Sequence, residues 1–421
     1  QLCQTCFHFT LLFLSRSLDY TSRLYNSNEI FLNSIIMVVS LKTTVAGIPM
    51  DCCIYNASGP RTGTSAALGK VAASQSGGVL AKSATPGKQT GNPMPRTWQS
   101  DAASLNSEGL PNAGIEYYID AKTIEESMGD TGKPYMVSIS GKTVEDNCDM
   151  IMKILAANKK NGNKIACLEL NLACPNVIGK PIIAYDFEQM KSVLATVSKV
   201  KGIEKLVLGI KLPPYFDGPH FRAAAQILNE YQHIVKYVAS INTIGNALAI
   251  DVISETPNIS SKGGFAGLSG KAVKHTALAN VRQMRTLLSP KIDVVGVGGV
   301  ETGTDAFELI LCGASAVQVG TCHWREGPKC FDRIADELKV LMKKKGYTSI
   351  DDFKGKLKEW NKEDANQARA ARKLQGTTGG GSAVGEPVQI RGGVDLAHAI
   401  NAALIIVIAV LVADKYGLIS V

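Results

Sequence analysis

The sequence lacks several features that would define a specialised class of protein. It has no low-complexity bulk and no evident short repeat, which argues against a disordered or fibrous chain. Its 10 cysteines follow no disulfide-framework spacing, and Cys3-x-x-Cys6 has no second pair downstream. These absences argue against a disulfide scaffold and a cysteine metal site, so we expect a reducing compartment, the cytoplasm, and no bound metal.

The positive charge is local and not accompanied by aromatic residues. The net charge is +8, and residues 339–373 hold 11 Lys/Arg against 5 Asp/Glu. Few aromatic side chains are available there to stack on bases, so a solvated helical face explains this segment better than a nucleic-acid site. We therefore predict no nucleic-acid partner.

The two ends of the chain differ from its centre. Residues 1–36 begin with Gln, and their apolar run at 11–14 is too short to span a bilayer; they read as a targeting segment or a non-native extension. Residues 363–395 read as a linker containing Gly376-Thr-Thr-Gly-Gly-Gly-Ser382. Beyond it, residues 396–413 form an 18-residue apolar run, which fits either a C-terminal membrane anchor or a packing helix.

The central part, residues 37–362, alternates short apolar runs with amphipathic stretches. This alternation predicts repeated βα units and a parallel sheet. Eight units predict an α/β fold of the (β/α)8 TIM-barrel type. A doubly wound open sheet is the alternative, but no Gly-x-Gly-x-x-Gly follows the first strand. The predicted strands are 53–56, 78–81, 135–139, 167–170, 206–210, 237–241, 292–296 and 316–319, with helices predicted at 145–158, 187–200, 221–231 and 304–312.

Polar residues follow the predicted strands where a barrel places its active site. Singly, each could be a surface residue or a helix cap, but their convergence predicts one site for a polar, partly anionic ligand. The last two strands end in glycines, which favours a phosphate-bearing cofactor there. The residues are Ala57-Ser58-Gly59, Lys82-Ser83, Asn171, Lys211, Asn242-Thr243, Gly298-Gly299 and Gly320-Thr321.

A strand also leads into the loop Asn171-Leu-Ala-Cys-Pro-Asn176. A lone cysteine is usually a small buried apolar residue. Here Cys174 is flanked by two carboxamides at a predicted strand end, so we interpret the loop as catalytic.

With these residues in place, the central part resembles the class 1A dihydroorotate dehydrogenases, which use fumarate and contain FMN. Several motifs occur in the family's order. They are Asn56-Ala-Ser-Gly-Pro60, Ala81-Lys-Ser83, Asn106-Ser-Glu-Gly-Leu-Pro-Asn112, Asn171-Leu-Ala-Cys-Pro-Asn176, Gly209-Ile-Lys-Leu-Pro213, Ile241-Asn-Thr-Ile-Gly-Asn246, Gly267-Leu-Ser-Gly270, Gly296-Val-Gly-Gly-Val300 and Gly313-Ala-Ser-Ala-Val-Gln-Val-Gly-Thr321.

The resemblance implies oxidation of dihydroorotate to orotate in pyrimidine (UMP) synthesis, with fumarate reduced to succinate, and a homodimer. Cys174 would take the C5 proton while hydride passes from C6 to the flavin. Lys211 would stabilise the reduced flavin. Substrate contacts are implied for Lys82, Asn106, Gly109, Leu110, Asn171, Asn176, Asn242 and Thr243. FMN contacts are implied for Ala57, Ser58, Gly59, Lys82, Ser83, Asn171, Lys211, Thr243, Gly267, Gly298, Gly299, Gly320 and Thr321.

Two residues depart from the family pattern. Glu108 stands where Met is usual, and Ala173 where Ser is usual. If the loop binds its ligand mainly through backbone N–H groups, Glu108 can point outward and be harmless. Two other functions stay open: an NAD-linked enzyme of class 1B that needs an electron-transfer partner, and a flavin-binding protein disabled by Glu108.

Overall fold

The computed structural model describes residues 38–173 and 182–374. The chain divides into two compact units, Gln1–Lys358 and Glu359–Val421. Within the second unit, the described part contains helix α12 (Lys362–Leu374), whose first turn is capped by Asn361. None of the helices in the described ranges is both long and apolar enough to cross a membrane. The predicted segments 1–36 and 396–413 lie outside those ranges, and the predicted domain limits stay predictions.

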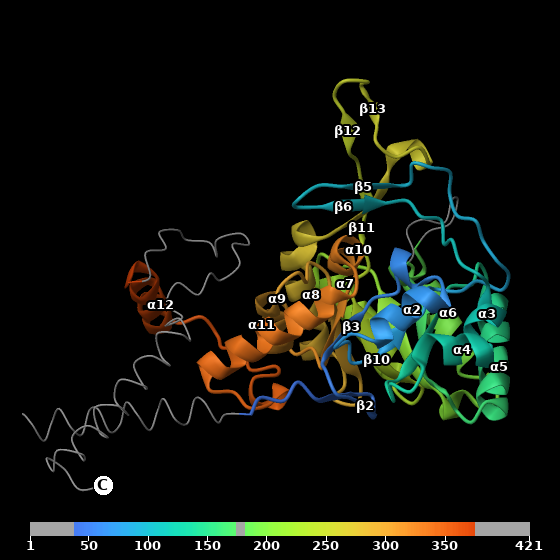
Figure 1. Cartoon of the computed structure of the whole chain (residues 1–421), viewed down its shortest axis with the longest axis horizontal. Helices are drawn as coiled ribbons and strands as arrows, with labels where there is room; N and C mark the ends of the chain where they lie inside the picture. Colours follow the sequence, from blue (N-terminus) through green and yellow to red (C-terminus); the bar gives the residue numbers. More distant parts are fainter. Residues whose placement is uncertain (1–37, 174–181, 375–421) are drawn as a thin grey trace, which may run out of the picture. The chain divides into compact units, whose positions relative to one another are not determined.

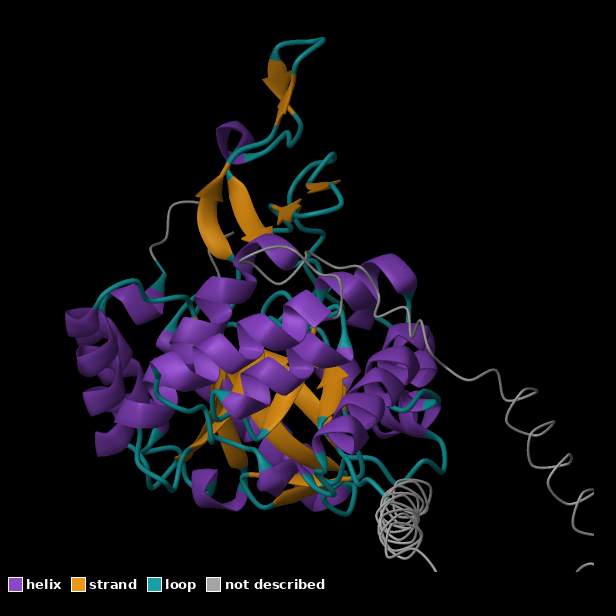
Figure 2. Cartoon of the chain, turned by 90° about the vertical axis from the view of Figure 1, so that its left-hand side faces the viewer, coloured by secondary structure: helices purple, strands orange, loops and turns teal. Residues whose placement is uncertain are grey.

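Eight parallel strands form the central sheet of the first unit, in the order β3-β16-β15-β10-β9-β8-β7-β4. All eight predicted strands are present, and the predicted (β/α)8 barrel is confirmed (Figure 2). Their bounds are β3 Ile54–Asn56, β4 Val79–Leu80, β7 Tyr135–Ile139, β8 Ile165–Asn171, β9 Val207–Leu212, β10 Val235–Ser240, β15 Asp293–Val297 and β16 Ala316–Val319.

Helices follow most of the strands and surround the sheet (Figure 1). The sequence signals are local: Thr143 and Thr302 accept hydrogen bonds at the starts of α5 and α9, where Asp146 and Asp305 complete capping boxes. The helices are α2 Ser65–Ala72, α3 Ile115–Ile119, α4 Ala121–Met128, α5 Val144–Lys160, α6 Phe187–Val197, α7 Gly218–Glu230, α8 Lys274–Leu287, α9 Gly303–Leu311, α10 Thr321–Glu326 and α11 Lys329–Lys345.

The apolar core has two layers, because successive strand residues point to opposite faces. A large cluster lies between the strands and the helices. A smaller cluster, which includes Tyr55, Leu80, Met136 and Tyr237, fills the barrel interior together with the hairpin of β1 (Thr43–Val45) and β2 (Ile48–Met50). The hairpin binds the first residue of β15, since Ala46 N–H donates to Asp293 at 2.6 Å, so it lies at the amino ends of the strands.

β3 and β4 are the first and last strands in the order of the sheet, and a side chain bridges the seam between them. The Asn56 amide donates to the Leu80 carbonyl at 2.6 Å and accepts from the Leu80 N–H at 2.9 Å. Asn56 is fully buried, so its amide satisfies the polar groups that a strand neighbour would otherwise satisfy.

A second, antiparallel sheet was not predicted. Its order is β11-β14-β6-β5, with bounds Ile244–Ala247, Ala266–Ser269, Ser104–Asn106 and Thr97–Gln99. The strands come from insertions after β4 and β10, and Figure 1 shows β5 and β6 beyond one end of the barrel, with the hairpin of β12 (Ile250–Asp251) and β13 (Thr256–Pro257) projecting further. This sheet covers the end of the barrel where the predicted site lies.

Candidate active site

A cavity of about 160 Å³ lies at the carboxyl ends of the barrel strands, between the barrel and the second sheet. Most of the predicted site residues line it, although they come from widely separated parts of the sequence. They are Ala57, Ser58, Gly59, Lys82, Ser83, Asn106, Leu110, Asn171, Lys211, Asn242, Thr243, Gly298, Gly299, Gly320 and Thr321.

Of the predicted residues that the structure describes, Gly109 and Gly267 are not among those that line the cavity. Cys174 and Asn176 lie outside the described residues. Gly109 has φ +67° and packs against Asn92, and a Cβ at Gly267 would lie 2.2 Å from Thr243 Oγ1. Both glycines therefore leave room for a neighbouring side chain of the site wall.

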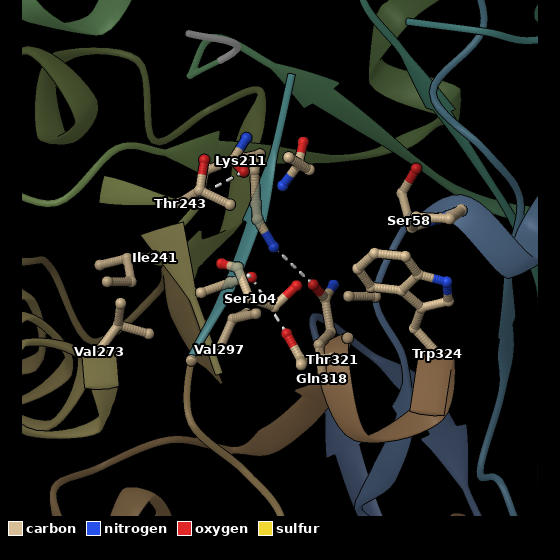
Figure 3. A pocket seen from close by; sticks show the side chains of 18 of the residues that line it. Ser58, Ser104, Lys211, Ile241, Thr243, Val273, Val297, Gln318, Thr321 and Trp324 are labelled. Atoms are coloured by element: carbon tan, nitrogen blue, oxygen red, sulfur yellow. Dashed lines mark hydrogen bonds between the residues drawn. The ribbon is translucent and has the colours of Figure 1, made fainter. Parts of the chain in front are cut away.

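Lys211 is held in the cavity by a buried polar network (Figure 3). Its Nζ donates to Gln318 Oε1 at 2.8 Å, and Gln318 Nε2 donates to Glu169 Oε2 at 2.7 Å and to the Tyr55 hydroxyl at 3.2 Å. Burial lowers the pKa of the Lys211 ammonium, and the Glu169 carboxylate partly offsets this. Lys211 can therefore present a fixed, poorly hydrated ammonium to a ligand.

Sequence reasoning assigned no role to Glu169 or Gln318, although both line the cavity. The signal was present in each case, because a polar residue stands between two apolar residues of a strand, in Leu168-Glu169-Leu170 and Val317-Gln318-Val319, and all six residues are buried. A buried polar side chain needs a partner, and in a barrel strand that partner lies inside the barrel.

Asn171 and Asn242 fix each other and the loop that follows β8. The Asn242 amide donates to Asn171 Oδ1 at 3.3 Å, and the same oxygen accepts from the Ala173 N–H at 3.1 Å. Asn242 Oδ1 in turn accepts from the Thr243 N–H at 2.9 Å. The two carboxamides are thus oriented before any ligand binds, and they place the residue directly before Cys174.

Two buried hydroxyl groups in the cavity wall are available to bind a ligand. The side-chain oxygens of Ser104 and Thr243 are buried and have no hydrogen-bond partner within the described part of the chain. Both are labelled in Figure 3. An unpaired buried hydroxyl costs free energy, so these groups fit a polar molecule in the cavity.

The predicted glycines after β15 are required by the backbone and by close packing. Gly298 and Gly299 have φ values of +125° and +73°, and a Cβ at Gly299 would lie 2.5 to 2.9 Å from Lys274 at the start of α8. They bring the backbone of the cavity wall against α8, as a phosphate site at this position needs.

Glu108 corrects one expectation. It does not point outward: the residue is 8% exposed, lines the cavity, and its Oε2 lies 3.3 Å from Arg96 Nε. The direction follows from the extended segment after β6, because Ser104, Asn106 and Glu108 all face the cavity while Ser107 bonds Asn92 and Ser261 on the other side.

This barrel, with a polar cavity and a buried lysine at the carboxyl ends of its strands, has the architecture of a (β/α)8-barrel enzyme. Comparison with known proteins identifies the family. The family model described as dihydroorotate dehydrogenase matches residues 40–342. The chain belongs to this family and is a flavin-dependent oxidoreductase.

Relatives of the chain share its whole central part. Dihydroorotate dehydrogenase A (fumarate) of Lactococcus lactis is 46% identical over 318 residues, covering 76% of this chain and 99% of the relative. Dihydroorotate dehydrogenase (fumarate) of Saccharomyces cerevisiae is 45% identical over 321 residues, with the same coverage. The crystal structure of DHODH in complex with ferulenol from Eimeria tenella is similar in fold, with a TM-score of 0.61 at 20% identity, covering 79% of this chain and 95% of that one.

Proposed function

We propose that the chain oxidises dihydroorotate to orotate in pyrimidine biosynthesis and passes the electrons to fumarate, which becomes succinate. One observation carries this proposal: the cavity joins Lys82, Asn106, Asn171, Lys211 and Asn242, which the family resemblance assigns to the substrate and the cofactor. The relatives named for fumarate match nearly their full length, which supports fumarate as the acceptor.

The residues of the cavity fit FMN as the flavin. Lys211 offers a desolvated cation, Thr243 a buried hydroxyl with no partner among the described residues, and Gly298 and Gly299 a backbone wall suited to phosphate. When bound, FMN supplies the acceptor for hydride. The buried ammonium of Lys211 favours negative charge on a neighbouring ring, and its bond to Gln318 fixes its direction.

The base is proposed to be Cys174. A free thiol with a pKa of about 8.5 is only a few per cent thiolate at neutral pH, but a positioned thiolate is an effective base. Asn171 and Asn242 support this assignment, because their hydrogen bonds hold Ala173, the residue before it. The Cys174 thiolate would remove the C5 proton of dihydroorotate, so turnover is expected to rise with pH.

Replacement of the base tests its role. Cys174→Ala is expected to keep bound flavin and lose flavin reduction by dihydroorotate by at least about 100-fold, the usual contribution of a general base. Stopped-flow absorbance under anaerobic conditions measures this. Cys148→Ala, a half-buried thiol on α5, is the matched control and should reduce normally. Normal reduction in Cys174→Ala would refute the assignment.

Two half-reactions test the function as a whole. The flavin of the anaerobic holoenzyme should bleach on addition of dihydroorotate and recover on addition of fumarate. Bleaching without recovery would point to another acceptor, such as NAD through a partner protein. Bound flavin that never bleaches would contradict the substrate.

The assembly is inferred from the family resemblance, and the location from the cysteine usage and the apolar run at residues 396–413. We infer a homodimer with its barrel in the cytoplasm, and the segment 396–413 as a possible site of membrane contact. Sedimentation analysis of the full chain, followed by fractionation with and without residues 396–413, tests both inferences.

A further inference from the structure

A charged pair that the family resemblance does not provide stands at the wall of the cavity. Glu108 lines the cavity with its side chain 11% exposed, and the side chain of its partner Arg96 is 22% exposed. The pair lies on the second sheet, where Arg96 directly precedes β5 and Glu108 follows β6. Because water has little access to either group, the attraction between them is poorly screened.

The surrounding backbone is built around this pair. Arg96 Nη1 donates to the carbonyls of Thr90 and Asn92 at 2.9 and 3.3 Å, and Asn92 N–H donates to the Glu108 carbonyl at 2.9 Å. Gly91, with φ +82°, leaves the space for the guanidinium, since a Cβ there would lie 2.5 Å from Arg96 Nη1. The guanidinium is therefore held against Glu108 from several sides.

The other acidic residues of the wall also have partners. Glu301 forms ion pairs with Lys271 and Arg325, and Glu169 accepts hydrogen bonds from Gln318 and Tyr237. Glu108 differs because its neighbours along the strand, Asn106 and the following Leu110, are residues assigned to the substrate. A carboxylate at this position would repel an anionic substrate if it were not compensated.

We propose that Arg96 is a positioning residue that neutralises Glu108 and thereby allows an anionic substrate to bind beside it. The inference rests on the proposed function, because dihydroorotate and orotate carry one carboxylate and fumarate carries two. The Arg96–Glu108 pair then sets the charge that these ligands meet, and fumarate, as the dianion, responds most strongly to it.

A double-mutant cycle on the flavin-loaded protein tests the proposal. Calorimetric titration with orotate and with fumarate is carried out on the wild type, Arg96→Gln, Glu108→Gln and the double variant. Arg96→Gln is expected to raise the dissociation constant for orotate about tenfold and that for fumarate about a hundredfold, because the interaction of a fixed charge doubles with a dianion. Glu108→Gln in the Arg96→Gln background is expected to return most of the lost affinity.

Lys42→Gln provides the charge control. Lys42 pairs with Asp51 at 3.1 Å, and the two side chains are 75% and 85% exposed, so this variant removes one positive charge away from the cavity. It should change neither dissociation constant by more than about twofold, as for other screened surface charges.

The other outcomes overturn the proposal in distinguishable ways. If the wild type binds both ligands and the double variant stays as weak as Arg96→Gln, Arg96 acts through the Thr90 and Asn92 carbonyls instead. Unchanged affinity in Arg96→Gln would also refute it. If only Glu108→Gln binds the ligands, Arg96 does not compensate the carboxylate, and the proposed activity of the wild type fails as well. If no variant binds either ligand, the substrate assignment itself is wrong.

Discussion

Gln318 connects two buried charges that would otherwise face each other through the interior of the barrel. Its side chain accepts from Lys211 and donates to Glu169, and it is fully buried. Gln318→Met keeps much of the volume but removes these two hydrogen bonds, together with the one that Gln318 donates to the Tyr55 hydroxyl. We expect a loss of about 2 to 4 kcal/mol in the free energy of unfolding, because two charged groups each lose a partner in a buried site.

Urea denaturation of the flavin-loaded protein measures this loss. Gln99→Met makes the same chemical change at an exposed position of β5 and should stay within about 0.5 kcal/mol of the wild type. A loss below about 1 kcal/mol in Gln318→Met would mean that Lys211 and Glu169 find other partners at little cost.

At the residue scale, the sequence was enough to predict most residues of the cavity wall but not the hydrogen bonds and ion pairs among their side chains. Asn171, Lys211 and Asn242 were predictable because each stands at or just after the carboxyl end of a barrel strand, and these strand ends meet at one site. The direction of Glu108 was not predicted correctly. Its partner Arg96 stands twelve residues earlier, directly before β5, and the pairing of β5 with β6 brings the two together.

At the scale of elements, the barrel strands were predictable because each is a short buried run between amphipathic stretches. The second sheet was not predicted, because its strands are very short and come from distant parts of the sequence. Its strands have three or four residues and lie in insertions more than a hundred residues apart, and β14 pairs with β6 only in the fold. Short, half-exposed strands carry too few residues for a hydrophobic period to show.

The bridge across the β3–β4 seam yields a prediction about closure of the barrel. Asn56→Leu removes the amide that pairs with both the N–H and the carbonyl of Leu80. We expect about 2 to 4 kcal/mol of lost stability, since two buried backbone groups lose their partner. Hydrogen exchange should show faster exchange of the Leu80 amide than in the wild type.

Asn56→Asp separates the two bonds of that bridge. A carboxylate can still accept from the Leu80 N–H but cannot donate to the Leu80 carbonyl. Protection of the Leu80 amide should therefore be largely retained in Asn56→Asp and lost in Asn56→Leu. Equal protection in both variants would show that the side chain does not close the seam.

For the barrel as a whole, His323 links stability to pH. This residue of α10 is 3% exposed and packs against Phe331, with the ring centroids 5.1 Å apart. Burial, and secondarily the charge of Arg61, lower the pKa of His323 to about 4 from an ordinary 6.5. The unfolded chain therefore binds a proton at a higher pH than the folded chain, so the contribution of His323 to stability is complete above pH 6.5 and is lost as the pH falls towards 4.

The difference between the pKa of His323 in the folded and in the unfolded chain sets the size of its effect on stability. A pKa lowered by this amount corresponds to about 3 kcal/mol between the two ends of the interval. Urea unfolding at pH 7 and at pH 4.5 should show a smaller loss of stability in His323→Phe than in the wild type, because phenylalanine has no proton to take up. Carboxylates that titrate in the same interval act on both proteins and cancel in the comparison. Parallel pH profiles for the two proteins would mean that His323 can accept a proton in the folded barrel without cost.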